Sequence, residues 1–404
     1  MLCQNLSTAV CMYNPGWGFR VSGFLCILTE TRRPHPRIRF FPKLLQQRGT
    51  REGRHPFEWI YTEEGEICMH IPENYLSPQT CGVMAAAMVP VWGVCIHKVK
   101  AELPKEKVAL MGAFGAFSFI SMMFNIPIPG GTTGHAVGGT LIAALLGPYA
   151  ACLSVSVALL LQALIFGDGG ILAFGANCFN MAFVLPFVGY AVFSLIRKHV
   201  KKNGDLIGAA VGSYLGINAA ALCAAIEFGI QPMLFRDSAG NALYCPYGLN
   251  VSIPAMMAGH LTIFGLAEVV FTVAVLAFVK KTSPALLESG AMAAASAGNA
   301  KQKKSGRALG ILMGILIVAT PLGLLAEGTA WGEWGVDEIA ATGIGYTPKG
   351  MLDGFSLQAL IPDYAVAGLP DWFGYILSAV IGAAVLIIVF RLIAGAGRKV
   401  QTES

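Results

Sequence analysis

The stretch PIPGGTTGH occupies residues 127–135, and an apolar run at 136–147 follows it directly. This run is shorter than the roughly 20 residues that a spanning helix needs, and it ends at Gly147-Pro148, a strong helix breaker. Because a segment buried inside protein can be shorter, we expect a short or inclined helix here, followed by its partner helix at 150–166. If this run crosses the membrane, every later helix has the opposite orientation from the one it would have if the run did not cross.

The remaining apolar runs are close to or above spanning length, and they lie at 80–97, 108–126, 150–166, 172–196, 205–226, 252–279, 309–327 and 373–395. Of the 404 residues, 55% are apolar and only 13% are charged, whereas soluble domains carry about 25% charged residues. We therefore expect an all-α, polytopic membrane protein surrounded by lipid, with about nine transmembrane helices. The net charge of +5 is modest and does not favour nucleic acid as a partner.

Basic residues cluster after alternate spans, which indicates the orientation of the chain. The clusters are Lys98, Lys100, Lys105 and Lys107; Arg197, Lys198, Lys201 and Lys202; Lys280, Lys281, Lys301, Lys303, Lys304 and Arg307; and Arg398 with Lys399. Nine spans with the amino end outside place every cluster in the cytoplasm, and leaving out 136–147 breaks this agreement. We therefore expect a multi-pass protein of the plasma membrane with a cytoplasmic C-terminus, in which residues 69–70 and loop 127–135 both face outward.

Met69-His70 and His135 form the candidate metal site. A chain that begins Met-His offers a free amine, the amide nitrogen of the second residue and an imidazole Nδ1, which together close two fused chelate rings around one ion. His135, in the glycine-rich loop, would supply a fourth nitrogen. Four nitrogens in a plane suit Ni(II) or Cu(II), and low-spin Co(II) accepts the same field. This chemistry requires Met69 to be the first residue of the mature chain.

Three stretches carry a resemblance to a known family: MHIPENYLSP at 69–78, FNIPIPGGTTGHAVGGTLIAALLGPYAA at 124–151 and QALIFGDGGILAFGANCFNM at 162–181. They resemble the CbiM/NikM family, the substrate-capture components of energy-coupling-factor transporters for cobalt and nickel. The resemblance covers about residues 69–280. It implies that the Met69 amine, the His70 amide and ring and the His135 ring hold the metal. It also implies ATP-driven import of Ni(II) or Co(II), with no resident cofactor.

The same resemblance implies that other chains hydrolyse the ATP. Its expected partners are a transmembrane coupling subunit and two ATPase subunits, and this chain has no GxxxxGK[ST] phosphate loop of its own. Two further stretches, TPLGLLA at 320–326 and GYILSAVIG at 374–382, resemble the small two-span accessory component of these transporters. In some members that component is fused to the capture protein.

The expected domain organisation has four parts. Residues 1–68 contain eight arginines and one lysine, whereas the rest of the chain has five arginines and fourteen lysines. They also lack a signal peptide's pattern, so we expect a misassigned start site and a disordered extension. Residues 69–280 form the seven-span metal-capture core, 281–308 a flexible cytoplasmic linker, and 309–404 the two-span accessory module.

Polar residues inside the apolar runs are candidates for a supporting shell around the metal. His260 lies near the outer end of the seventh span with Glu268 two turns deeper, and such intramembrane polar groups are often functional. Asn125 and Asn177 could brace the site, although hydrogen bonds between helices explain all of these residues equally well. Asp168, in Gly167-Asp168-Gly169-Gly170, is expected to cap a helix or turn.

Two other classes of function stay open at this stage. An intramembrane metal-dependent hydrolase would need an open coordination position, but HExxH is absent and four nitrogens would fill the site. A secondary transporter of a small solute would need broken helices in two related halves, and no internal repeat is visible. The sequence does not choose between nickel and cobalt.

Overall fold

The structure is a computed structural model, which describes residues 70–128, 132–284, 299–326 and 329–399. Met69 and the extension 1–68 lie outside this described part. The helices of the first half are α1 (Pro78–Glu102), α2 (Lys105–Met122), α3 (Gly139–Leu146), α4 (Pro148–Leu161), α5 (Phe174–Asn177), α6 (Leu185–His199) and α7 (Gly204–Gly229). Two π-helical stretches continue them, η1 (Gln162–Phe166) and η2 (Cys178–Val184). The strands β1 (Ile126–Ile128) and β2 (Thr132–Gly134) form an antiparallel hairpin.

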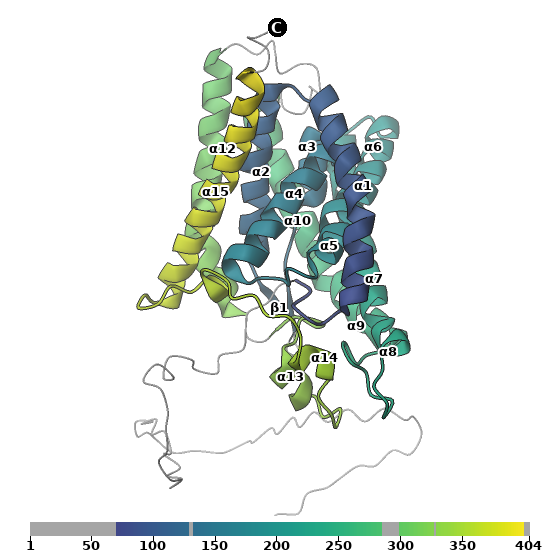
Figure 1. Cartoon of the computed structure of the whole chain (residues 1–404). Helices are drawn as coiled ribbons and strands as arrows, with labels where there is room; N and C mark the ends of the chain where they lie inside the picture. The colour runs from purple at the N-terminus through teal and green to yellow at the C-terminus, as the bar shows by residue number, and fades with distance from the viewer. Residues whose placement is uncertain (1–69, 129–131, 285–298, 327–328, 400–404) are drawn as a thin grey trace, which may run out of the picture. The chain divides into compact units, whose positions relative to one another are not determined.

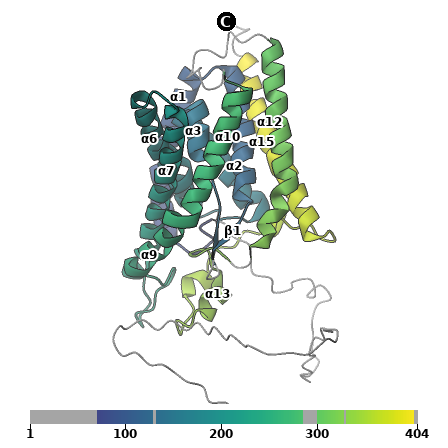
Figure 2. The ribbon, with the colours of Figure 1, turned by 180° about the vertical axis from the view of Figure 1, so that it is seen from behind.

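The second half begins with α8 (Gln231–Leu234), α9 (Leu249–Gly259), the π-helical η3 (His260–Phe264) and α10 (Gly265–Thr282). It continues with α12 (Asn299–Ala319), the 3₁₀ turns η4 (Thr320–Leu325) and η5 (Pro362–Tyr364), α13 (Val336–Ala341), α14 (Lys349–Leu352) and α15 (Asp371–Lys399). The long helices lie side by side in one bundle, and α15 runs along α2 (Figures 1 and 2).

Within the described ranges, seven helical stretches are long and apolar enough to cross a membrane: 78–102, 148–166, 174–199, 204–234, 249–282, 307–325 and 371–395. A shorter apolar helix spans Lys107–Met122. Large apolar side chains such as Val83, Val270 and Leu392 are exposed on the outer faces, as expected of a surface that meets lipid. The predicted all-α polytopic membrane fold is confirmed.

The segment 136–147 is not a full helical span. Helix α3 covers eight of its twelve residues and is therefore only about 12 Å long. The segment still takes the chain from one end of the bundle to the other. His135 lies beside His70, before the first residue of α1, whereas Tyr149 lies under Lys98 near the last turn of α1, with Nζ 5.9 Å from the ring centroid. The non-helical residues 135–138 and α3 together make the crossing.

The extended part of this crossing is paired with buried side chains. The amides of Val137 and Gly138 donate to the Glu268 carboxylate at 2.7 and 3.0 Å. The hydroxyl groups of Ser118 and Ser121 donate to the carbonyls of Val137 and Ala136 at 2.7 and 3.0 Å. Non-helical backbone at membrane depth is tolerated where protein groups replace water in this way. Glu268 thereby sets the start of α3.

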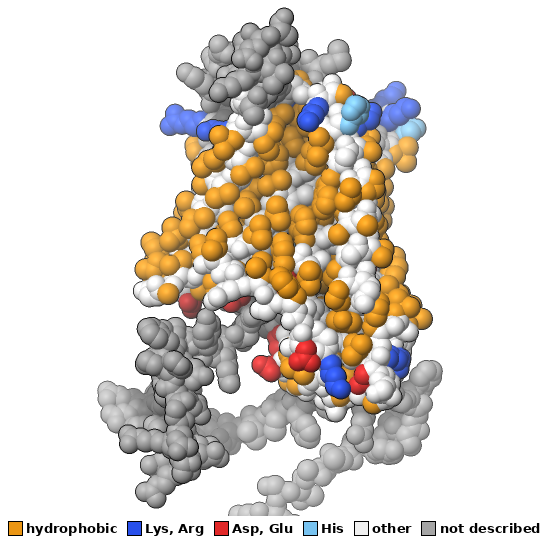
Figure 3. Space-filling view, viewed as in Figure 1, with side chains coloured by type: hydrophobic (Ala, Val, Ile, Leu, Met, Phe, Trp, Pro, Cys, Tyr) orange, Lys and Arg blue, Asp and Glu red, His pale blue; other side chains and the backbone are white. Residues whose placement is uncertain are grey.

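Charge is distributed unequally between the two ends of the bundle. Figure 3 shows most of the Lys and Arg side chains on its visible face at the end where α1 and α15 finish, beyond an apolar band. Asp and Glu gather at the opposite end, below the start of α1 (Figure 3). The basic clusters predicted to share one side of the membrane therefore do lie at one end of the bundle.

Candidate metal site

The two histidines predicted to bind metal lie next to each other at the acidic end of the bundle. The ring centroids of His70 and His135 are 5.1 Å apart, with 58° between the ring planes. His70 precedes α1 and is 2% exposed, and His135 follows β2. Residues 65 positions apart are thus brought together, as the sequence predicted. Met69, whose amine belongs to the predicted ligand set, lies outside the described residues.

The β-hairpin holds His135 in place. Its register pairs Ile126 with Gly134 and Ile128 with Thr132, so His135 follows directly from a paired residue. Gly134 lies so close to Phe264 that a Cβ there would come within 2.7 Å of the ring. The hairpin is therefore seated on η3, and its end points the His135 ring at His70.

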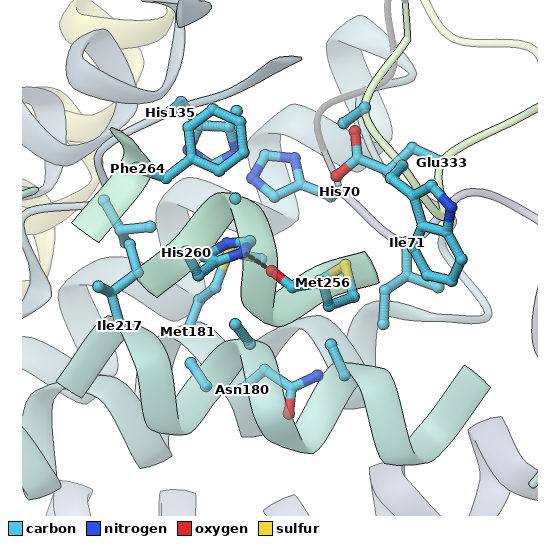
Figure 4. Close-up of a pocket in the computed structure, with 18 of the residues that line it drawn as sticks. His70, Ile71, His135, Asn180, Met181, Ile217, Met256, His260, Phe264 and Glu333 are labelled. Atoms are coloured by element: carbon cyan, nitrogen blue, oxygen red, sulfur yellow. Dashed lines mark hydrogen bonds between the residues drawn. The ribbon is translucent and has the colours of Figure 1, made fainter. Parts of the chain in front are cut away.

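A cavity of about 100 Å³ lies against both imidazoles. Its wall includes His260 and Asn180 from the capture core and Trp331 and Glu333 from the C-terminal region. Figure 4 shows the His70 and His135 rings on one side of this cavity, His260 opposite them, and the Glu333 carboxylate pointing towards His70. Nitrogen, oxygen and sulfur donors are all within reach of the space, because Met181 and Met256 also line it.

Asp168 holds the His70 ring. Its Oδ1 lies 2.8 Å from His70 Nδ1, and both side chains are buried. The other oxygen, Oδ2, accepts hydrogen bonds from Gln162 Nε2 and from the hydroxyl group of Tyr364. The sequence predicted that Asp168 caps a helix or turn, and it missed this contact with His70. The predicted chelation through Nδ1 stays a prediction, because Met69 lies outside the described residues; in the structure Nδ1 lies beside Asp168.

Two glycines explain how Asp168 reaches this position. Gly169 has a φ of +87°, and a Cβ there would lie 2.9 Å from the Cβ of His70. A Cβ on Gly170 would lie 2.7 Å from the backbone nitrogen of Glu73. The Gly167–Gly170 turn therefore wraps the segment that starts at His70. The glycine pattern was the available signal, because glycine marks places where backbones approach closely.

The three predicted supporting residues have different surroundings. Asn177 contacts the residue after His70 through two hydrogen bonds: Ile71 N donates to Oδ1 at 3.1 Å, and Nδ2 donates to the Ile71 carbonyl at 3.2 Å. His260 lines the cavity, and its Nδ1 lies 2.9 Å from the Met256 carbonyl. Asn125 is buried but does not line the cavity. Of the three, Asn177 most directly fixes the backbone beside a predicted ligand.

Glu73 fixes the same segment from its other side. Its carboxylate accepts hydrogen bonds from the amides of Ile171 and Leu172, just before α5. Burial raises the pKa of Glu73, and these two amide contacts act in the opposite direction. The segment 70–77 is therefore held at Ile71 and at Glu73 by residues of the 171–177 region, which limits how far His70 can move.

The C-terminal region contributes to the site at three points. Trp331 N–H donates to Thr132 Oγ1 on the hairpin, and Asn74 exchanges two hydrogen bonds with the backbone of Phe355. Glu333 lines the cavity, and its Oε2 is buried without a hydrogen-bond partner in the described part of the chain. Burial, together with the charges of Asp168 and Glu338, raises the pKa of Glu333 well above the ordinary range of a carboxyl group. The sequence did not predict this contribution.

The two predicted imidazole ligands lie together, and other side chains with donor atoms line the same cavity. Within the described ranges, no group of three or more His, Cys, Asp or Glu side chains is arranged to hold a metal ion. His70 and His135 are the two predicted side-chain ligands that converge. The full predicted ligand set stays a prediction, because Met69 lies outside the described residues.

Comparisons with known proteins agree with the geometry. The family described as "cobalt uptake substrate-specific transmembrane region", CbiM, matches residues 70–286, and a PDGLE domain matches residues 305–399. A crystal structure described as a truncated transition metal transporter is 57% identical, with a TM-score of 0.50, and the match covers 53% of this chain and 99% of that one.

Two fused nickel transport proteins are similar to this chain along nearly their whole length, and a cobalt transport protein is similar to part of it. A probable fused nickel transport protein of Lactiplantibacillus plantarum is 51% identical over 80% of this chain and 97% of its own. A fused nickel transport protein of Rhodobacter capsulatus is 45% identical over 81% and 97%. A cobalt transport protein of Desulforamulus reducens is 33% identical over 46% and 72%.

All these relatives are named as metal transport proteins, which fits a transporter rather than an enzyme. The predicted resemblance, including the fused C-terminal module, is confirmed. Two adjacent histidines, a bundle of apolar helices and similarity along nearly the whole length of two fused nickel transport proteins lead to one conclusion. This chain is a multi-pass membrane protein of the nickel and cobalt transport family defined by the CbiM region, and a PDGLE domain follows that region.

Proposed function

We propose that this chain captures Ni(II) or Co(II) outside the cell for an ATP-driven importer. The metal ligands are the Met69 amine, His70 and His135. The observation that carries the proposal is the convergence of the two imidazoles, 5.1 Å apart, on one cavity. Imidazole nitrogen is a common ligand for nickel and related divalent metals. The transported ion is the substrate, and no resident cofactor is needed.

The direction of transport follows from the charge distribution. Because basic residues are retained on the cytoplasmic side of a membrane, the end carrying Lys98, Arg197 and Lys280 faces the cytoplasm. The metal site lies at the other end and faces outward, in the plasma membrane, and the C-terminus is cytoplasmic. As the family resemblance implies, two ATPase subunits hydrolyse ATP and act through a transmembrane coupling subunit; this sequence has no phosphate-binding loop of its own.

Residue 69 completes the site when it is the first residue of the mature chain. This places the start of the working protein at Met69 and assigns residues 1–68 to an upstream start site. The proposal is supported by the position of His70, which is buried beside His135. A main-chain amine directly before His70 would reach the same ion. Mass spectrometry of the protein purified from its native cell identifies the residue at its amino end.

Equilibrium dialysis against Ni(II), Co(II) and Zn(II) tests the proposal on purified protein. His70→Ala and His135→Ala should each lower nickel or cobalt affinity at least about 100-fold, because loss of an outer-shell partner alone costs 10–100-fold. His97→Ala is the matched control, since His97 is an exposed histidine next to Lys98 at the basic end. Equal affinity in all four proteins would refute the assignment.

The same assay tests the amine. The proteins compared begin at Met1, at Met69, or at Met69 with an alanine inserted before His70. Only the chain that begins Met69-His70 places an amine directly before the imidazole, so it should bind nickel or cobalt most tightly. Equal affinity of all three chains would remove Met69 from the ligand set and leave the two histidines.

A further inference from the structure

Two buried side-chain oxygens near the cavity have no hydrogen-bond donor. They are Oε1 of Glu227 on α7 and Oδ1 of Asn180 in η2, and no group in the described part of the chain donates to either. Glu227 is 6% exposed and Asn180 is 3% exposed. A buried acceptor without a donor costs free energy of folding, so two such atoms together indicate an ion or a water as their partner.

One hydrogen bond joins the two side chains. Asn180 Nδ2 donates to Oε2 of Glu227 at 2.9 Å. An ionised carboxylate only accepts hydrogen bonds, so the Asn180 amide must turn Nδ2 towards it, and Oδ1 is then the atom left over. The two unpaired oxygens therefore belong to adjacent side chains, as the ligands of a single ion must.

The charge of Glu227 favours a cation as this partner. None of the ion pairs within the described ranges includes Glu227. The residue lies in a helical stretch, 204–234, that is long and apolar enough to cross a membrane. A buried carboxylate is costly when no positive charge accompanies it, and acidic residues inside membranes commonly mark the pathways of ions.

The cavity beside the two imidazoles extends to this pair. Asn180 forms part of its wall, and so does Ala224 of α7. Glu227 comes three residues after Ala224 and therefore lies on the same face of the helix. Figure 4 shows Asn180 on the side of the cavity away from the imidazoles of the candidate metal site. An ion that leaves those imidazoles meets Asn180 without leaving the cavity.

Asn180 also lies deeper in the bundle than the segment that carries His70. Asn177 bonds to Ile71, the residue after His70, and Asn180 comes roughly one helical turn later. The helical run that contains both asparagines continues through α6 and ends at His199, among the basic residues of the opposite end. The pair is thus displaced from the first site in the direction of inward transport.

Gln231 holds the turn that bears Glu227 next to the start of α1. Its Nε2 donates to the Glu227 carbonyl at 2.8 Å, and its Oε1 accepts from the backbone nitrogen of Ser77 at 3.0 Å. Ser77 caps α1 and ends the segment 70–77 that begins with His70. The pair is therefore preformed at a fixed place relative to the first metal site.

We propose that Glu227 and Asn180 form a second, weaker position for the transported divalent metal, which the ion occupies after it leaves His70 and His135. Glu227 Oε1 supplies a negative charge, Asn180 Oδ1 supplies a neutral oxygen, and water completes the coordination. Nickel and related metals favour imidazole nitrogen over such oxygen ligands, so this position releases the ion readily. The inference rests on the proposed function, because its ligand is the ion captured at the first site.

Mn(II) is a suitable probe, because carboxylate, carbonyl and water oxygens are its preferred ligands. The full chain in detergent is loaded with one equivalent of Ni(II), and Mn(II) is then titrated in while electron paramagnetic resonance records the free Mn(II). The wild type should bind one Mn(II). Glu227→Gln and Asn180→Leu, which keep the size of each side chain, should each lower Mn(II) affinity at least about 10-fold.

Glu102→Gln is the matched control for this titration. Glu102 is an exposed carboxylate near the end of α1, where it forms an ion pair with Lys98. Its removal should leave Mn(II) affinity unchanged, which separates binding at Glu227 from weak binding at surface carboxylates.

Nickel uptake tests whether the position lies on the transport route. Cells that make the chain with its natural partners are given radioactive nickel, and uptake is divided by the amount of the chain in the membrane. Glu227→Gln should lower the maximal rate at least about 10-fold. The affinity of the purified variant for the first Ni(II) should fall far less than in His70→Ala. A variant that was merely misfolded would lose both.

The outcomes separate the possible failures. If the wild type binds no Ni(II) tightly, the proposed function is wrong, while the Mn(II) titration still tests the Glu227 pair. Equal Mn(II) affinity in the wild type, Glu227→Gln and Asn180→Leu would overturn the second position and leave a buried water as the partner of the two oxygens. Unchanged uptake in Glu227→Gln, or a loss of first-site affinity as large as in His70→Ala, would overturn its place on the route.

Discussion

The surroundings of Glu333 disfavour the charged form of its carboxyl group. It belongs to the PDGLE region, yet its carboxylate points into the cavity beside His70, with Oε2 buried (Figure 4). Burial and the charges of Asp168 and Glu338 raise its pKa well above the ordinary range. A buried carboxylate that lacks a full set of partners costs free energy of folding, and such groups are common where a protein binds a cation.

The raised pKa of Glu333 makes stability depend on pH in a defined direction. The folded protein holds this proton more tightly than the unfolded chain, so its stability falls as pH rises from the ordinary carboxyl pKa towards the raised one. In Glu333→Gln, a metal-free sample should therefore unfold about 2–4 °C higher than the wild type at pH 8, with a smaller difference at pH 5.

Thermal unfolding in detergent with a chelator present measures this. Asp337→Asn is the control, because Asp337 is an exposed acidic residue on the neighbouring helix α13. A lower unfolding temperature for Glu333→Gln at pH 8, or a difference from the wild type that does not change with pH, would contradict the assignment.

The convergence of His70 and His135 could be predicted from the sequence, but most of the contacts that hold them in place could not. Met69-His70 and His135 carry a local pattern whose chemistry implies that they meet, and His70 and His135 do meet. Asp168 was expected to cap a helix or turn close to it in sequence. Its contact with His70, 98 positions away, could not be predicted because no local pattern indicates it. Tyr364 and Glu333 are further still, on a region whose contact with the core depends on how the helices pack.

At the scale of elements, the crossing of residues 135–147 combines a short non-helical segment with the eight-residue helix α3. Glu268 on α10 accepts from the amides of Val137 and Gly138, where the positive end of the α3 dipole favours a carboxylate. His135 lies only two residues before this contact. The same carboxylate therefore supports both the start of α3 and the place of a predicted metal ligand.

Glu268→Gln should destabilise the protein. The glutamine amide has only one acceptor oxygen, and its N–H₂ group would face the backbone N–H donors. One buried N–H group would then lack an acceptor, at a cost of about 1–3 kcal/mol. Thermal unfolding in detergent should show a decrease of several degrees. Glu102→Gln breaks an exposed ion pair with Lys98, worth about 0–1 kcal/mol, and should change little. Equal effects of the two changes would exclude the role of Glu268.

The sequence predicted this element only in part. The apolar run and the parity of the basic clusters indicated a crossing at 136–147, and the chain does run between the two ends there. The non-helical start of the segment, residues 136–138, was not predicted, because apolarity alone does not distinguish helix from other backbone conformations. The groups that satisfy it, Ser118, Ser121 and Glu268, lie on other helices.

At the scale of the molecule, the separation of charge predicts the topology. A fluorescent protein fused after Ser404 should fold and fluoresce in the cytoplasm, and alkaline phosphatase fused there should be inactive. The opposite result is expected for fusions made after Ala239, in the loop between α8 and α9, which lies at the metal-site end. Active phosphatase after Ser404 would place the metal site in the cytoplasm and would refute capture from outside.

The packing of α15 along α2 has a consequence for how the two regions stay together. Gly112 on α2 meets the backbone of Leu386 and the side chain of Phe390 so closely that a Cβ there would come within 2.9 Å of both residues. Contacts of this kind can keep the PDGLE region docked even if the connection between α10 and α12 is cut. The covalent link then serves mainly as a tether, which raises the effective concentration of one region near the other to the millimolar range. It also fixes their ratio at one to one, whatever the rate at which the cell makes the protein.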